Sequence, residues 1–131
     1  MTAIQSQFEK KYEKLLKLLV ETGKHIIVVV PYFPQFQGEM RRRAIFSMAV
    51  FNDVILRLAF EGGLPVIDLR ITFTDEADFA SPIEPSALGG LKVAKLINQV
   101  LKEFDFSKKR TSIFHLQENV GPQEGSLVLR R

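Results

Sequence analysis

The stretch "HIIVVVPYF", His25 to Phe33, decides the fold class of this chain. Five consecutive β-branched residues end at a proline, a pattern typical of a strand buried on both faces of a parallel sheet. A second apolar stretch, "LPVIDLRI" from Leu64 to Ile71, predicts another strand. The chain has 131 residues, which is enough for one domain with one hydrophobic core.

Three helices are predicted around these strands. Apolar residues recur at helical spacing over residues 8–20, and this helix ends at Gly23 in a C′ position. Residues 39–63 contain no proline and no internal glycine, and their apolar positions predict a heavily buried helix. Residues 86–104 form the third helix. Its expected core-facing side consists of Leu91, Ala94, Ile97, Leu101 and Phe104.

The order helix, strand, helix, strand, helix predicts an α/β fold with right-handed crossovers and a parallel sheet. Two strands are too few for the usual doubly wound sheet of about five. We therefore expect a missing element: another chain, a second copy, or an absent N-terminal half. Residues 107–131 are assigned to a tail, for which a short hairpin and a loosely attached segment remain alternatives.

Composition narrows the function classes. Hydrophobic residues make up 46% and charged residues 25%, as in globular proteins. There is no apolar run of about 18 residues and the N-terminus is polar, so we expect a soluble, unexported, cytoplasmic protein without a membrane span. The absence of cysteine excludes thiolate chemistry. The net charge is +3, and the basic clusters at 41–43 and 108–110 accompany no nucleic-acid-binding motif, so nucleic acid is not an expected partner.

Candidate chemistry lies in the loops after the strands, because ligands of open α/β sheets bind at the carboxyl ends of the strands. The second loop, residues 72–86, is acidic and precedes a helix N-terminus. Glu84 is either a catalytic group or a turn carboxylate that the helix dipole favours by about 0.3 to 1 kcal/mol. We take Glu84 and Asp78 as the candidate catalytic residues. The cluster Asp75, Glu76 and Asp78 fits a solvated loop better than a metal site, and no cofactor is predicted.

Two segments carry a resemblance to a known family. Residues 51–70, "FNDVILRLAFEGGLPVIDLR", and residues 82–97, "PIEPSALGGLKVAKLI", resemble the C-terminal half of SGNH hydrolases, the GDSL-type lipases and esterases. The matching positions are Asn52, Asp68, Pro85, Ser86, Gly89 and Gly90. The resemblance implies a three-layer α/β/α sandwich of flavodoxin-like type, with residues 1–106 as its C-terminal half and the N-terminal side incomplete. It also implies serine ester hydrolysis of small acyl or carbohydrate esters.

The sequence departs from that family at the catalytic positions. The Gly-Asp-Ser block of the nucleophile and the Gly-X-Asn-Asp block are missing. The resemblance places Ser81 at the family's Asp and Glu84 at its His. A glutamate is a poorer base than histidine by about two pKa units. Ser86 fits a helix N-cap better than a nucleophile.

We therefore expect a module that is inactive alone. The alternative is a non-enzymatic oligomerising or partner-binding α/β module. The expected partners are further copies of the chain or a complementing N-terminal chain, and a small ester is the substrate that the resemblance implies.

Overall fold

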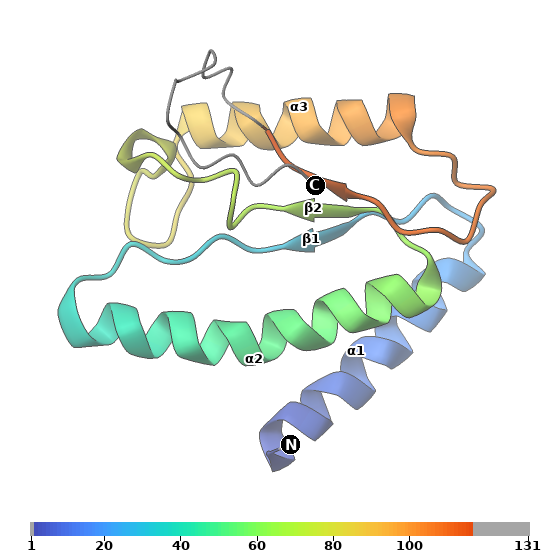
Figure 1. Ribbon diagram of the computed structural model, residues 1–131, viewed down its shortest axis with the longest axis horizontal. Helices are drawn as coiled ribbons and strands as arrows, with labels where there is room; N and C mark the ends of the chain where they lie inside the picture. Colours follow the sequence, from blue (N-terminus) through green and yellow to red (C-terminus); the bar gives the residue numbers. More distant parts are fainter. Residues whose placement is uncertain (1, 117–131) are drawn as a thin grey trace, which may run out of the picture.

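The computed structural model describes residues 2–116, which form three helices and a three-stranded parallel sheet. Helix α3 lies on one face of the sheet, and α1 and α2 lie on the other (Figure 1). The predicted α/β class with a parallel sheet is confirmed. The elements in chain order are α1 (Ala3–Glu21), β1 (Val28–Val30), α2 (Gly38–Gly62), β2 (Val66–Asp68), the 3-10 turn η1 (Glu76–Asp78), α3 (Ala87–Glu103) and β3 (Ile113–Phe114).

Strand β2 is the middle strand of the order β1-β2-β3. The third strand comes from the segment that the sequence assigned to a tail. The chain just before it is held to two other elements, because the Val66 amide of β2 donates to the carbonyl of Ser112 at 2.9 Å and the Thr111 hydroxyl donates to the carbonyl of Ala59 in α2 at 3.1 Å. The second apolar stretch of the expected hairpin lies outside the described residues.

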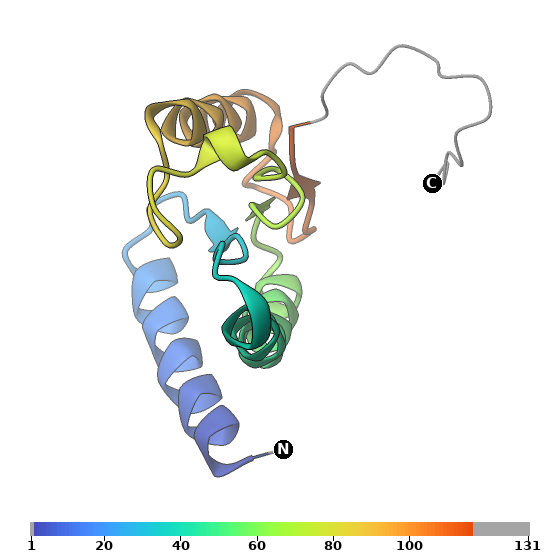
Figure 2. The same ribbon diagram turned by 90° about the vertical axis from the view of Figure 1, so that its left-hand side faces the viewer.

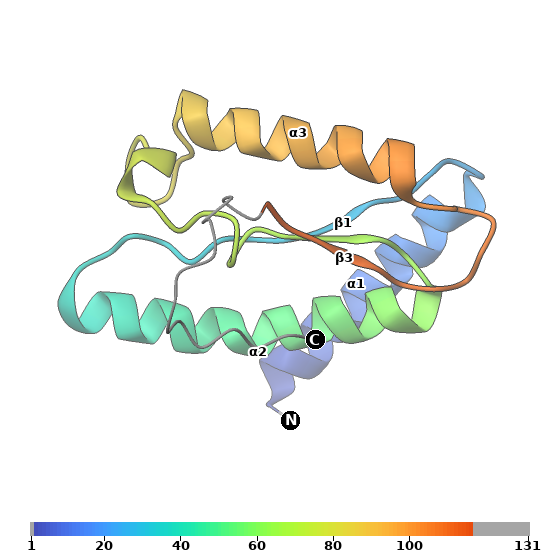
Figure 3. The same cartoon turned by 45° about the horizontal axis from the view of Figure 1, so that its top comes forward.

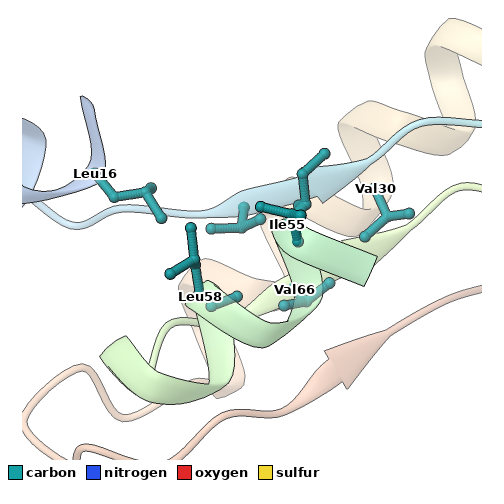
Figure 4. Packing of buried hydrophobic residues seen from close by; sticks show 8 residues of the cluster. Leu16, Val30, Ile55, Leu58 and Val66 are labelled. Atoms are coloured by element: carbon teal, nitrogen blue, oxygen red, sulfur yellow. The ribbon is translucent and has the colours of Figure 1, made fainter. Parts of the chain in front are cut away.

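The central strand separates two hydrophobic cores. Val66 faces the core under α2, and Ile67 faces the core under α3, because successive strand residues point to opposite faces. Figure 4 shows the first core, in which α1, β1 and α2 meet. Its buried residues are Leu16, Val28, Val30, Val54, Ile55, Leu58, Ala59 and Val66. The second core is built on Ile67, Leu69, Phe73, Leu96 and Val100.

One of the two crossovers contradicts the predicted right-handed connections. Both crossovers step in the same direction across the sheet, yet α2 and α3 lie on opposite faces, so their hands differ. In Figure 2 the strands point toward the viewer, and the β2-α3-β3 connection is the left-handed one. Such connections are right-handed in about 98% of cases. The short β3 is placed by its own contacts with β2, and these put it on the side of β2 away from β1.

The face of α3 that packs on the sheet also differs from the prediction. The buried residues are Gly89, Leu96 and Val100, whereas Leu91 and Leu101 are about half exposed. Ala94 and Ile97 are exposed as well, and of the five predicted residues only Phe104 packs against the second core. Apolar residues cover more than one side of this helix, so periodicity alone could not choose between the sides. The Ser86 cap was predicted correctly, because its hydroxyl oxygen accepts from the Gly89 amide at 3.1 Å.

Gly63 joins the end of α2 to the approach of β3. It closes the helix with φ of +63°, a left-handed conformation that favours glycine. A Cβ at this position would also lie 2.6 Å from the backbone carbon of Lys109. The sharp end of α2 and the close passage of the chain before β3 therefore depend on the same glycine.

The adjacent glycines of α3 provide a matched test of its packing. A Cβ on Gly89 would overlap the carbonyl oxygen of Asp78 and lie 3.0 Å from the Phe73 ring, whereas a Cβ on Gly90 meets nothing within 4 Å. We expect Gly89→Ala to lower the free energy of unfolding by about 2 kcal/mol through overpacking. Gly90→Ala should raise it by about 0.5 to 1 kcal/mol. Urea unfolding measures both, and equal effects at the two sites would contradict this packing.

Candidate functional site

The loops after β1 and β2 meet at the carboxyl ends of the strands. This is also the end at which α2 and α3 begin (Figure 3). The Gln35 amide donates to the carbonyl of Pro82 at 2.7 Å, and the Tyr32 hydroxyl donates to the carbonyl of Ile83 at 2.8 Å. The two loops predicted to carry chemistry are therefore brought together.

Three aromatic rings fill the space between these loops and the sheet. Tyr32 stacks on Phe73 with ring centroids 4.6 Å apart and an interplanar angle of 3°. Phe79 meets both rings edge-on, at 5.2 Å and 5.5 Å. Burial, and then the negative charge of Glu84, raise the pKa of Tyr32 above its ordinary value. These contacts make Tyr32 part of the cover over the strand ends.

Glu84 lies in a tight turn that its own backbone closes. Its carbonyl accepts from the Ala80 amide at 2.9 Å, and its amide donates to the Ser81 hydroxyl oxygen at 3.1 Å. The residue is exposed, and among residues 2–116 no side chain forms a hydrogen bond with its carboxylate. The contacts observed here are those of a turn residue, and a catalytic role for Glu84 stays a prediction.

Asp78 is fully buried and paired with a helix residue. The Lys92 ammonium lies 2.8 Å from Oδ1 and donates to Oδ2 at 3.0 Å, and the Asp75 amide also donates to Oδ2, at 3.1 Å. Sequence reasoning missed this pair because Lys92 is not on the side of the helix that was expected to face the core. The available signal was its spacing: Lys92 lies three residues after Gly89 and four before Leu96, which puts all three on one side of the helix. Asp78 thus connects η1 to α3.

The remaining sequence candidates lie apart from one another. Among the described residues, no three His, Asp or Glu side chains are grouped to hold a metal ion. Asp68 ends β2 and accepts from both Nε and Nη2 of Arg70, at 3.0 Å and 2.6 Å. Asn52 is buried in α2, and its Nδ2 has no hydrogen-bond partner in this part of the chain, a feature that nothing in the structure explains.

A depression of ≈ 410 Å³ opens beside the turn of Glu84. It is lined by Gln35, Gln37, Glu76, Phe79, Ala80, Ser81 and Pro82. Amide, carboxylate and hydroxyl groups could bind a small polar molecule there. The Ser81 oxygen is held by the Glu84 amide, however, and no base is hydrogen-bonded to it in the described structure. The depression therefore offers polar groups to a small molecule, but its side chains do not combine a nucleophile with a base that could activate it.

Comparisons with models of protein families, with curated proteins and with solved structures found no match to this chain. The resemblance to SGNH hydrolases therefore remains a hypothesis that rests on the quoted residues. None of the helices within residues 2–116 has the length and apolarity needed to cross a membrane.

The buried pair between Asp78 and Lys92 is tested by removing its cation. In Lys92→Met the buried Asp78 carboxylate loses its counter-ion, and we expect the free energy of unfolding to fall by about 3 kcal/mol. Lys95→Met is the control, because Lys95 is exposed on the same helix. Chemical unfolding at neutral pH compares the two variants. A loss in Lys92→Met no larger than that in Lys95→Met would show that the pair contributes nothing.

The influence of Glu84 on Tyr32 gives a pH-dependent test. Removing the charge in Glu84→Gln should lower the pKa of Tyr32 toward its ordinary value, because the carboxylate disfavours the phenolate. Absorbance titration in a Tyr12→Phe background follows Tyr32 alone, since the chain has two tyrosines. Glu76→Gln is the control and should leave the midpoint unchanged. Because the pKa of Tyr32 is raised in the folded state, ionisation of this residue lowers the free energy of unfolding. Its contribution to stability is therefore complete below pH of about 10 and is lost as the pH rises further.

Proposed function

We propose that this chain is a non-enzymatic association module, an α/β half-domain whose sheet is completed by another polypeptide. The observation that carries the proposal is the exposure of the Val29 side chain. It stands in the middle of an apolar strand, yet it is 39% exposed, whereas its neighbours Val28 and Val30 are 3% and 0% exposed. A strand of a parallel sheet is normally covered on both faces. The uncovered face supports the expectation of a missing element.

Exposed apolar residues on α3 support the same proposal. Leu88, Leu91 and Leu101 are each about half exposed, on a helix whose opposite side is packed on the sheet. Burying apolar surface contributes about 25 cal/mol per Å², so uncovered side chains of this size favour association. The described part of the chain thus offers both a strand edge and apolar surface to a partner.

Ester hydrolysis is the second candidate. The observation that favours it is the depression beside Ser81 at the carboxyl ends of the strands, where α/β sheets bind their ligands. In this proposal a complementing N-terminal chain brings the serine nucleophile, the oxyanion donors and the base. A small acyl or carbohydrate ester would be the substrate. This chain then contributes the loop around Glu84.

Hydrolysis of p-nitrophenyl acetate by the purified chain tests whether this chain has esterase activity on its own. We expect no turnover above a denatured blank, because no described side chain is arranged to activate a nucleophile. Glu84→Ala and Glu76→Ala form a matched pair of exposed carboxylates from the same loop. Turnover that is lost in Glu84→Ala and kept in Glu76→Ala would overturn the non-enzymatic proposal and assign Glu84 a catalytic role.

A further inference from the structure

The backbone of β1 has a free edge centred on Val29. The Val28 amide donates to the carbonyl of Pro65 at 3.0 Å, and the Val30 carbonyl accepts from the Leu69 amide at 3.0 Å. In a parallel pair, alternate residues of a strand bond to the neighbouring strand, so the N–H and C=O of Val29 point away from β2. Among the described residues no strand pairs with this edge. Within residues 2–116, the Val29 backbone therefore has no strand partner on this edge, and its side chain is 39% exposed.

The exposed Val29 side chain lies on the α3 face of the sheet, because Val28 and Val30 point into the α2 core. Gln99 and Glu103 line a depression with β3, which places that flank of α3 over the β3 side. Ile97 and Leu101 each lie two residues earlier, which is about 200° around the helix. They are 38% and 55% exposed, and this rotation places them on the opposite flank, toward β1.

We propose that a second copy of this chain pairs with the free edge of β1, antiparallel about a two-fold axis at Val29. The proposal rests on the association function above and names its partner. At the centre of such a pair, Val29 exchanges both backbone hydrogen bonds with Val29 of the other copy. The two valine side chains then lie opposite each other on the α3 face, where each is exposed in the single chain.

Three features fit a second copy as the partner strand. Val29, Ile97 and Leu101 are all uncharged and exposed, so a two-fold axis at Val29 brings no like charges together among them. Pro31 has no N–H to offer on the outward side of the strand, and pairing about Val29 places this gap at the ends of the ladder instead of its middle. Pairing turns a sheet of three strands into one of six, close to the usual size.

Sedimentation equilibrium of the full chain over a range of concentrations tests the proposal. We expect a dimer, and we expect Val29→Lys to weaken its association by at least about tenfold, because the new ammonium groups meet directly across the two-fold axis. Ile113→Lys is the matched control: Ile113 is an exposed apolar residue of the opposite edge strand, at 45% exposure. It should leave association unchanged. Circular dichroism confirms that both variants fold.

Amide hydrogen exchange of the unmodified chain gives a second measurement that needs no variant. The Val29 amide should be protected more strongly as the concentration rises, since pairing closes the edge toward which it points. A monomer at all concentrations would overturn the second-copy proposal. So would a dimer that Ile113→Lys breaks and Val29→Lys does not. Neither result bears on the hydrolysis test, so failure of this proposal is distinguishable from failure of the non-enzymatic function.

Discussion

The burial of β2 on both faces is the constraint on which the rest of the structure depends. Val66 and Ile67 are both fully buried, yet they belong to different cores. Helix α2 must therefore cover one face and α3 the other. The position of the loops at the carboxyl ends follows, because each helix begins where the preceding strand has ended. The short β2 sets the layers, the crossovers and the place of the candidate site.

Much of this architecture could be predicted because it depends on local chemistry. The β-branched run correctly predicted β1, and the segment without proline or internal glycine correctly predicted α2. The Ser86 hydroxyl caps α3 as expected. Features that depend on distant contacts could not be predicted. Two residues are too short to show where a strand pairs, so the sequence left this segment as a hairpin or a loose tail and did not place β3 in the parallel sheet. The packed side of α3 is selected by the approach of Gly89 to Asp78, a contact with another part of the chain.

The candidate site shows the same division. An acidic loop before a helix was visible in the sequence, and the structure gives its members different surroundings. Asp78 is buried against Lys92, whereas Glu84 is exposed in a turn that its main chain closes. Residue type alone could not separate these two carboxylates, because the difference lies in what packs around them. The chemistry open to each carboxylate therefore depends on its surroundings.

Because the crossover helices α2 and α3 lie on opposite faces of the sheet, the molecule also divides into two units, each with its own core. The segment β1-α2-β2 is a right-handed unit with its own core, to which α1 contributes Leu16. Helix α3 packs on the other face and β3 extends the sheet beside β2, and both contribute to a second core. Release of α3 and β3 would expose Ile67 but leave the first core intact. The two cores have no buried residue in common, and they meet at β2, which contributes Val66 to one and Ile67 to the other.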